Sequence, residues 1–210
     1  MANGLSIRSA MLGDAESLAA IYAPYVRDTA VSFEVAPPTT AEFAKRIEDI
    51  QERYPYLVAE QDGTICGYAY AGPFKPRAAY ALSAELSVYV DRPWQGKGVG
   101  RALYGALESE LAVMGVTNLY ACVAYPRVED EYLTYASVRF HERMGFKIVG
   151  RFHGCARKST AFTTWSGWRE SSVQYDAAKA TVALPALRLA TAAIIRSVTE
   201  RRRRTCCERP

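Results

Sequence analysis

The stretch YVDRPWQGKGVGRALYGAL, Tyr89–Leu107, decides the fold. It joins a strand-like run to an amphipathic helix through three alternate glycines, Gly96, Gly98 and Gly100. A glycine-rich turn at the start of a helix leaves backbone N–H groups unpaired at the positive end of the helix dipole. Phosphate groups are therefore the usual ligands of such a turn. The Walker pattern is unmet because Arg101 follows the last glycine, and the dinucleotide pattern G-x-G-x-x-G is unmet as well. The loop favours a phosphate-bearing ligand of another class, and the alternative is a glycine-rich connection without a ligand.

Composition limits the kind of protein that can carry this loop. Half of the 210 residues are hydrophobic, which is ample for a core. The beginning of the chain shows no basic flank followed by an apolar run, and no stretch of 18 apolar residues could span a bilayer, so we expect a cytoplasmic protein without a membrane partner. The five cysteines include no C-x-x-C pair and the chain has two histidines, so we expect neither structural disulfides nor a metal site.

The net charge of +4 is a property of the C-terminal region. Residues 159–210 hold nine Lys or Arg against four acids, which leaves 17 basic and 18 acidic side chains in residues 1–158. The basic run at 201–204 lacks interleaved aromatic residues and a recognition helix. We therefore expect no nucleic-acid partner and a solvated basic tail.

The periods of hydrophobic residues alternate along residues 1–158 and predict a mixed sheet with helices on both faces, in the α/β (α+β) class. The expected elements, in chain order, are a strand at 5–10, a helix capped by Asp14, a helix capped by Thr40, a hairpin turning at Asp62 and Gly63, a strand at 80–90, a helix over Gly98–Met114, a buried strand at 117–126, a short helix ending at Gly145 and a strand at 147–155.

The loop Gln95–Gly100, directly after a strand ending in SVYV, resembles the acetyl-CoA pyrophosphate loop of the GNAT N-acetyltransferase superfamily, whose pattern is Q/R-x-x-G-x-G/A. The segments RYPYLVAE, GYAYAGPFKPRAAY, AELSVYV and SVRFHERMGF, in this order, resemble the phosphinothricin acetyltransferase branch, which acetylates small amino-acid-like substrates such as phosphinothricin and methionine sulfoximine. The resemblance runs from Ile7 to Lys158. It implies the GNAT fold, N-acetyl transfer from acetyl-CoA to a small amine, and a homodimer.

The loop chemistry agrees with a CoA pyrophosphate. Lys97 and Arg101 sit where they could reach phosphates, and Gln95 can supply amide hydrogen bonds. The resemblance implies that the preceding strand, Leu86–Val90, pairs through its backbone with the pantetheine arm. The residues expected to bind acetyl-CoA are Leu86, Val88, Val90, Gln95, Gly96, Lys97, Gly98, Val99, Gly100 and Arg101.

Acetyl transfer needs a group that takes a proton, because an α-amino group of pKa roughly 8 is largely protonated at neutral pH. Glu85 lies in an otherwise apolar strand, where a carboxylate is costly unless it is paired or working, and the resemblance implies a general base. An edge or salt-bridged glutamate is the alternative. For His141 the resemblance implies a proton relay to Glu85 or to the CoA sulfur. The alternative is a histidine that is packed in the core without a catalytic role. Cys122 is expected to be buried without a base, so we expect direct transfer in a ternary complex.

The acceptor pocket is less well defined by the sequence. Lys75 and Arg77 lie on a loop between strands, where they could hold a carboxylate or phosphinate, and the alternative is a pair of solvated loop charges. Many relatives place an asparagine that contacts CoA near Thr134 or Ala136, and neither residue here can supply an amide. The residues expected to bind the acceptor are Phe33, Glu34, Lys75 and Arg77.

Two domains are expected: a GNAT domain at 1–158 and an aberrant, loosely structured basic tail at 159–210. Relatives close their sheet with a strand resembling DMVWME, whereas this chain reads STAFTTWSGWR from Ser159. With suitable codons, one added T before codon 159 converts that peptide to FNRFHDMVWME, and the codons of Trp165 and Trp168 are fixed as TGG. We therefore expect a frameshift that removes the closing strand and leaves residues 147–155 as an exposed edge. A catalytically impaired acyl-CoA-binding relative is the alternative function.

Overall fold

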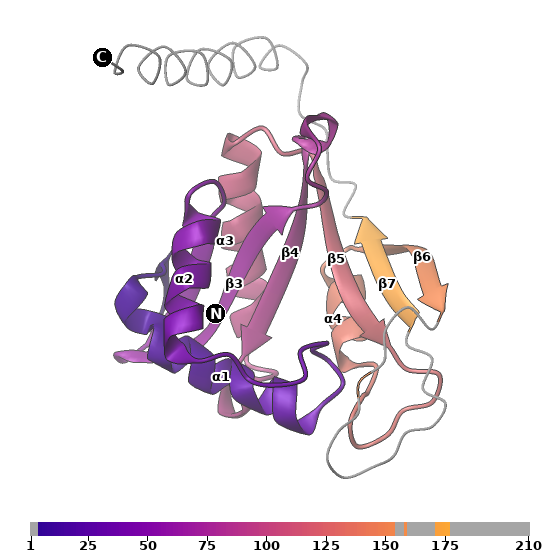
Figure 1. The fold of residues 1–210 in the computed structure, drawn as a ribbon, viewed down its shortest axis with the longest axis horizontal. Helices are drawn as coiled ribbons and strands as arrows, with labels where there is room; N and C mark the ends of the chain where they lie inside the picture. The colour runs from indigo at the N-terminus through magenta and orange to yellow at the C-terminus, as the bar shows by residue number, and fades with distance from the viewer. Residues whose placement is uncertain (1–3, 154–157, 159–170, 177–210) are drawn as a thin grey trace, which may run out of the picture. The chain divides into compact units, whose positions relative to one another are not determined.

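A mixed sheet runs through the described part of the chain, which comprises residues 4–153, 158 and 171–176 of a computed structural model. All of these residues belong to the unit Met1–Ala178. The strands are β1 (Leu5–Ser9), β2 (Tyr56–Gln61), β3 (Thr64–Pro73), β4 (Ser83–Val90), β5 (Asn118–Tyr125), β6 (Lys147–His153) and β7 (Ser171–Asp176). Their spatial order is β1-β2-β3-β4-β5-β7-β6 (Figure 1), and β4 and β5 form a parallel pair among antiparallel neighbours.

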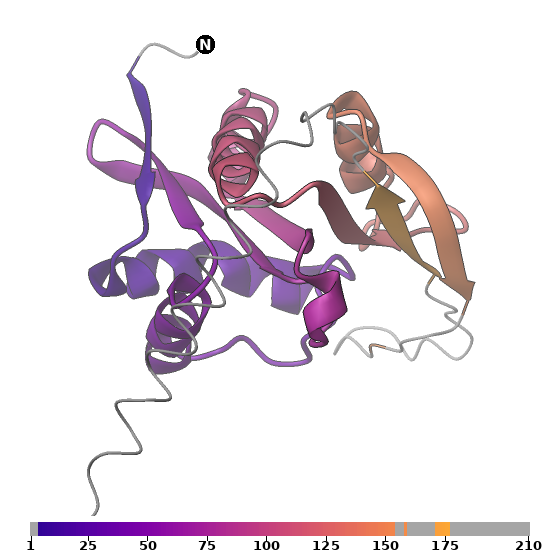
Figure 2. The ribbon, with the colours of Figure 1, turned by 90° about the horizontal axis from the view of Figure 1, so that it is seen from above.

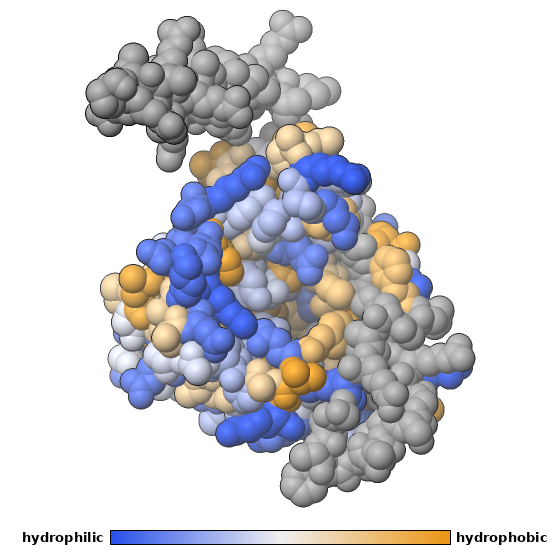
Figure 3. All heavy atoms as spheres, viewed as in Figure 1, coloured by the Kyte–Doolittle hydropathy of each residue, from blue (hydrophilic) through white to orange (hydrophobic). Residues whose placement is uncertain are grey.

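Helices cover both faces of this sheet. They are α1 (Ala15–Asp28), α2 (Thr40–Gln51), α3 (Val99–Val113) and α4 (Ala136–Arg143). α1 and α2 lie on one side, and α3 and α4 on the other (Figure 2). The amphipathic pattern of α2 buries Phe43 and Ile47, and its outward face is hydrophilic (Figure 3). The α/β prediction of a mixed sheet between helical layers is therefore confirmed.

The helix starts differ in detail from the sequence prediction. Thr39, not Thr40, caps α2: its hydroxyl accepts from the Glu42 N–H at 3.2 Å, and the Glu42 carboxylate accepts from the Thr39 N–H at 2.6 Å. This reciprocal pair is a capping box. Asp14 precedes α1, but its side chain makes no capping bond to that helix. The carboxylate instead pairs with the Arg8 guanidinium at 2.7 Å, which lowers the pKa of Asp14.

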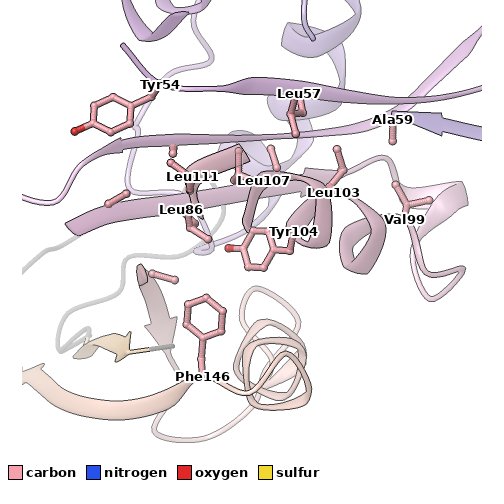
Figure 4. Close-up of a cluster of buried hydrophobic side chains, with 14 of the residues drawn as sticks. Tyr54, Leu57, Ala59, Leu86, Val99, Leu103, Tyr104, Leu107, Leu111 and Phe146 are labelled. Carbon is pink, nitrogen blue, oxygen red and sulfur yellow. The ribbon is translucent and has the colours of Figure 1, made fainter. Parts of the chain in front are cut away.

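Each face of the sheet has its own hydrophobic core. On the α3 side, leucines at helical spacing pack against β2, β3 and β4 (Figure 4). Leu103 and Leu107 of this core are fully buried. On the α1 and α2 side the core is rich in tyrosine. Its aromatic members are Tyr22, Phe43, Tyr56 and Tyr68, with Tyr25, Tyr70 and Tyr89 packed against them.

One segment of the tail that was expected to be loosely structured forms a strand. Residues 171–176 form β7, which pairs antiparallel with β5 on one side and with β6 on the other. The segment SSVQYD contains Val173 and Tyr175 at alternate positions, a period that suits a strand, and each neighbour offers backbone groups to pair. Residues 159–170 and 177–210, on which the rest of the tail prediction falls, lie outside the described residues.

Candidate active site

The site begins where β4 and β5 separate. β4 pairs with β3 from Ala84 to Val90, but it pairs with β5 at three residues alone, Ser83 to Glu85. Beyond that point the two strands diverge (Figure 1), and no described strand pairs with Leu86–Val90 on the β5 side. A strand edge with unpaired N–H and C=O groups can accept an extended amide-containing chain as an added strand. The part of this edge at Leu86 and Val88 fits the predicted pantetheine arm, whereas the N–H and C=O of Val90 bond to the Tyr25 hydroxyl.

The glycine loop follows directly and delivers the N-terminus of α3. Gly96 and Gly98 have positive φ angles of 74° and 88°, which favour glycine. Gly98 is the N-cap residue of α3, and Ala102 donates the first hydrogen bond to its carbonyl at 3.0 Å. The amides of residues 99–101, which lie between Gly98 and Ala102, therefore have no partner within the helix and point out of its N-terminal end, as an anion site requires.

Val99 and Gly100 contribute to this loop through their backbone. The Val99 side chain is buried in the α3 core. Gly100 has an ordinary φ, and a Cβ atom there would lie 3.1 Å and 3.3 Å from two ring atoms of Phe140 in α4. The glycine at this position is thus required by the close approach of α3 and α4, a reason that the sequence pattern alone did not reveal.

Polar side chains hold the loop against α1. The Tyr25 hydroxyl donates to the Val90 carbonyl at 2.5 Å, and the Gln95 amide donates to the same hydroxyl at 2.8 Å. In this structure the Gln95 side chain therefore holds the loop in place through Tyr25. From the sequence, a direct bond of this side chain to CoA was expected. Lys97 lies over the Trp94 ring at 5.0 Å, and the side chains of Lys97 and Arg101 are exposed beside the loop.

Glu85 is the last residue of β4 that pairs with β5. Successive side chains of a strand alternate between faces, so Glu85 shares a face with Ser87 and Tyr89, and Tyr89 packs against Tyr22 of α1. Glu85 therefore projects from the α1 and α2 face of the sheet. Burial raises the pKa of the Glu85 carboxyl, and the positive charge of Lys75 partly opposes this rise. A half-buried carboxylate with a raised pKa is suited to accept a proton.

An aromatic stack lies beside Glu85. Tyr120 is the register partner of Glu85 on β5, and its ring stacks on Phe74 with a centroid distance of 4.2 Å. Lys75 lies over Phe74 at 5.1 Å. The positive charge of Lys75 lies near enough to Glu85 to lower its pKa, while Arg77 lies at the start of a short 3-10 turn with its side chain exposed.

His141 is buried on the α3 side of the sheet. Its Nδ1–H donates to the Ser137 carbonyl at 2.7 Å, and its Nε2 lies 3.0 Å from the Tyr104 hydroxyl. The Tyr104 ring lies between α3 and Phe146 (Figure 4). Burial lowers the pKa of His141 to about 4, so the ring is neutral at pH 7 and Nε2 accepts the Tyr104 proton. Both ring nitrogens are engaged within the core.

The residues expected on the opposite wall are held by α2. Glu34 forms a two-pronged ion pair with Arg46, with distances of 2.7 and 3.1 Å, and accepts from the Tyr22 hydroxyl at 3.2 Å. Phe33 is 40% exposed. Sequence reasoning missed Arg46, because an arginine on an amphipathic helix resembles a solvated charge. It also missed the hydroxyl role of Tyr25, because a tyrosine at helical spacing resembles a core residue.

One side-chain prediction on β5 is wrong. Cys122 is exposed, although the strand looked buried throughout. Ala121 and Val123 are buried beside it, so the apolar run is a strand with one covered face at this point.

The described residues contain neither a cluster of metal ligands nor a helix that could span a membrane. No group of three or more His, Cys, Asp or Glu side chains could hold a metal ion in this part of the chain. None of the helices described here combines the length and apolar character needed to cross a bilayer.

This chain is similar to known proteins in sequence and in fold. Residues 7–162 match the family model described as an acetyltransferase (GNAT) domain. The chain is 32% identical over 166 residues to phosphinothricin N-acetyltransferase of Streptomyces viridochromogenes, covering 79% of this chain and 84% of the relative. It is 30% identical over 155 residues to the L-methionine sulfoximine/L-methionine sulfone acetyltransferase of Pseudomonas aeruginosa, covering 73% and 86%.

A solved structure agrees with these sequence matches. The crystal structure of a GNAT superfamily phosphinothricin acetyltransferase from Sinorhizobium meliloti, in complex with acetyl-CoA, superposes with a TM-score of 0.71 at 28% identity, covering 86% of this chain and 92% of that one. The resemblance seen in the loop and in the flanking segments is confirmed. This chain belongs to the GNAT superfamily of N-acetyltransferases.

Proposed function

We propose that the protein transfers the acetyl group of acetyl-CoA to the amino group of a small amino-acid-like acceptor, directly and within a ternary complex. The observation that carries this proposal is the half-buried Glu85, with a raised pKa, at the point where β4 leaves β5. The acceptor class is supported by the names of the relatives, which act on phosphinothricin and on methionine sulfoximine or sulfone.

The chemical step places Glu85 between two substrates. The acceptor ammonium gives a proton to the Glu85 carboxylate, directly or through water. The freed amine attacks the thioester carbonyl carbon, an N–C bond forms, and the C–S bond breaks. The attacking nitrogen then loses its second proton and the leaving thiolate gains one, directly or through water, so the products are an acetamide and CoA.

The chain positions acetyl-CoA with backbone groups above all. The open edge Leu86–Val90, which includes Val88, would pair with the pantetheine arm, and the amides at the start of α3 would bind the pyrophosphate. The exposed Lys97 and Arg101 would add charge to the same phosphates. Their exposure leaves both side chains able to reach a bound anion.

On the acceptor side, Lys75 would hold the carboxylate while the amine faces Glu85. Arg77 and Phe33 would complete the pocket, and Glu34, with its carboxylate fixed by Arg46, would shape the opposite wall. His141 would have a structural role, joining α4 to Tyr104 of α3, because a neutral ring with both nitrogens engaged is a poor proton donor at pH 7.

A thiol-release assay tests this function. The full chain is mixed with acetyl-CoA and either methionine sulfoximine or phosphinothricin, and free CoA thiol is followed against a no-acceptor control. Acceptor-dependent release supports the proposal. Binding of acetyl-CoA by calorimetry without acceptor-dependent release, across a panel of amino acids, would instead favour the alternative of a catalytically impaired acyl-CoA-binding relative.

We also propose a homodimer that works in the cytoplasm. At the end of the strand order, β6 presents Ile148, Val149 and Phe152 with exposed side chains, and such a surface suits a second copy of the chain. Light scattering measures the mass in solution, and cell fractionation measures the location. A monomer at micromolar concentration would contradict the dimer.

A further inference from the structure

Lys158 carries a buried ammonium group with three backbone partners. The residue is 8% exposed, and its Nζ donates to the carbonyls of Val26 at 2.7 Å, Ser32 at 2.8 Å and Thr29 at 3.0 Å. An ammonium group has three N–H donors, and these three carbonyls use them all. Because burying a charge is unfavourable unless its hydrogen bonds are made, these contacts determine where the side chain can lie.

The three carbonyls belong to the end of α1 and the segment that follows it. The last four carbonyls of a helix lack intrahelical partners, and Val26 lies in that last turn. The Thr29 hydroxyl satisfies another of them by donating to the Tyr25 carbonyl at 2.6 Å. A cation at this place also interacts favourably with the negative end of the helix dipole. Lys158 therefore caps the C-terminal end of α1, although it lies 132 residues after Val26 in the sequence.

The segment fixed by Lys158 leads to the proposed acceptor wall. The Ser32 hydroxyl shares a hydrogen bond of 2.5 Å with the Tyr22 hydroxyl and accepts from the Glu34 N–H at 3.2 Å. Glu34 in turn holds Arg46. Phe33 lies between the two residues that are tied in this way. The orientation of Phe33 and Glu34 thus depends on a backbone segment that Lys158 fixes from one side and α1 and α2 from the other.

We propose that Lys158 is a positioning residue for the acceptor: its ammonium group orders the segment 26–32 and so places Phe33 and Glu34 at the acceptor site. This inference rests on the proposed function for its kinetic consequence. The segment meets the cofactor side through Asp28, whose carboxylate pairs with Arg92 before the glycine loop at 2.7 Å. This ion pair is exposed and exposed pairs contribute little, so the effect on acetyl-CoA should be much smaller than the effect on the acceptor.

The test compares Lys158→Met with Lys45→Met. Methionine keeps the length of the side chain and removes all three donors, and Lys45 is an exposed lysine paired with Asp49 on α2, so its substitution is a control for lost charge. Lys158→Met should raise the acceptor KM about tenfold or more and leave the acetyl-CoA KM within about twofold, because three buried hydrogen bonds to the segment are lost. Lys45→Met should change neither.

Hydrogen exchange gives a second readout that needs no activity. In the full chain, the amides of residues 29–34 should exchange faster in Lys158→Met than in the unchanged protein, while those of α3 should not. Unchanged exchange in 29–34, or equal increases in both KM values, would overturn the proposal. If Lys158→Met does not fold, Lys158→Arg serves instead, since a planar guanidinium keeps the charge but cannot match three converging carbonyls. An acceptor KM unchanged by that variant would equally overturn it.

The two proposals can fail separately. An unchanged protein that acetylates none of the amines tested contradicts the proposed function, whereas faster exchange in 29–34 of Lys158→Met would still support the ordering role. If the unchanged protein is active and Lys158→Met has the same acceptor KM, the positioning role alone is contradicted.

Discussion

Burial has opposite effects on the two titratable residues that the sequence singled out. It raises the pKa of Glu85, which keeps this carboxylate basic enough to take a proton, and it lowers the pKa of His141 to about 4. The sequence identified both residues. It could not distinguish their roles, because the strand alternation of Glu85 and the Tyr104 contact of His141 depend on which face each element presents.

Stability should report the buried state of His141. The folded protein holds this ring neutral, with a pKa of about 4 against 6.5 for the ordinary group, so the unfolded chain binds the proton more readily between these values. His141 therefore makes stability fall as pH drops from 6.5 to 4, by up to about 3 kcal/mol. Urea unfolding of the unchanged protein and of His141→Phe at pH 4.5, 5.5 and 6.5 checks this. Parallel pH slopes for the two proteins would contradict it.

The charge of Lys75 should be visible in the pH profile of the reaction. Lys75 lowers the pKa of Glu85, so Lys75→Met should raise it, and the acidic limb of kcat/KM should move to higher pH because the base then stays protonated longer. Lys97→Met is the control, since that lysine lies at the cofactor loop beside Trp94. An acidic limb in the same place for Lys75→Met and for the unchanged protein would argue against Glu85 as the titrating group.

Among the elements, local patterns predicted existence and type well. The apolar, strand-like runs of β2 to β5 and the helical spacing of α1 to α3 stand in the sequence, and they predicted the mixed sheet. Contacts between elements did not follow. Cys122 faces outward and β7 comes from a segment with no family pattern, because each depends on what another part of the chain places beside it. The cap of α2 is local, since Thr39 and Glu42 have the T-x-x-E spacing of a capping box, and the sequence prediction placed it one residue too late.

Gly100 provides a test of the α3–α4 contact. A methyl group there would lie within 3.3 Å of the Phe140 ring, so Gly100→Ala should lower the free energy of unfolding by about 1–3 kcal/mol. Gly105→Ala is the matched control on the same helix, since its Cβ would meet nothing within 4 Å, and it should stabilise by about 0.5–1 kcal/mol. Phe140→Leu should relieve part of the loss. Equal unfolding midpoints for the two alanine variants would contradict this packing.

The whole molecule assembles its site from distant parts of the chain. The site that we propose would draw Glu34, Lys75, Glu85 and the loop at 95–101 from four separate segments. The sequence predicted most of these residues through family resemblance. It gave no sign of Lys158 as a partner of α1, because a contact across 126 or more residues leaves no local pattern.

For the whole chain, we propose that residues 159–210 arose by a frameshift, with β7 as a strand supplied by the shifted sequence. Sequencing the gene around codon 159 checks this. We expect one inserted nucleotide to restore a reading frame that encodes a segment resembling DMVWME after Lys158. A gene in which no single insertion there produces such a segment would rule out the frameshift.

The central claim is that Glu85 takes the proton from the acceptor amine, and Glu85→Gln tests it most directly. Glutamine keeps the shape and removes the base, so kcat/KM for the acceptor near pH 7 should fall by roughly 10² to 10⁴-fold, while acetyl-CoA binds as before. The deficit should narrow at pH above the pKa of the acceptor amine, where the amine is already free. Activity of Glu85→Gln within a few-fold of the unchanged protein at pH 7 would contradict the account.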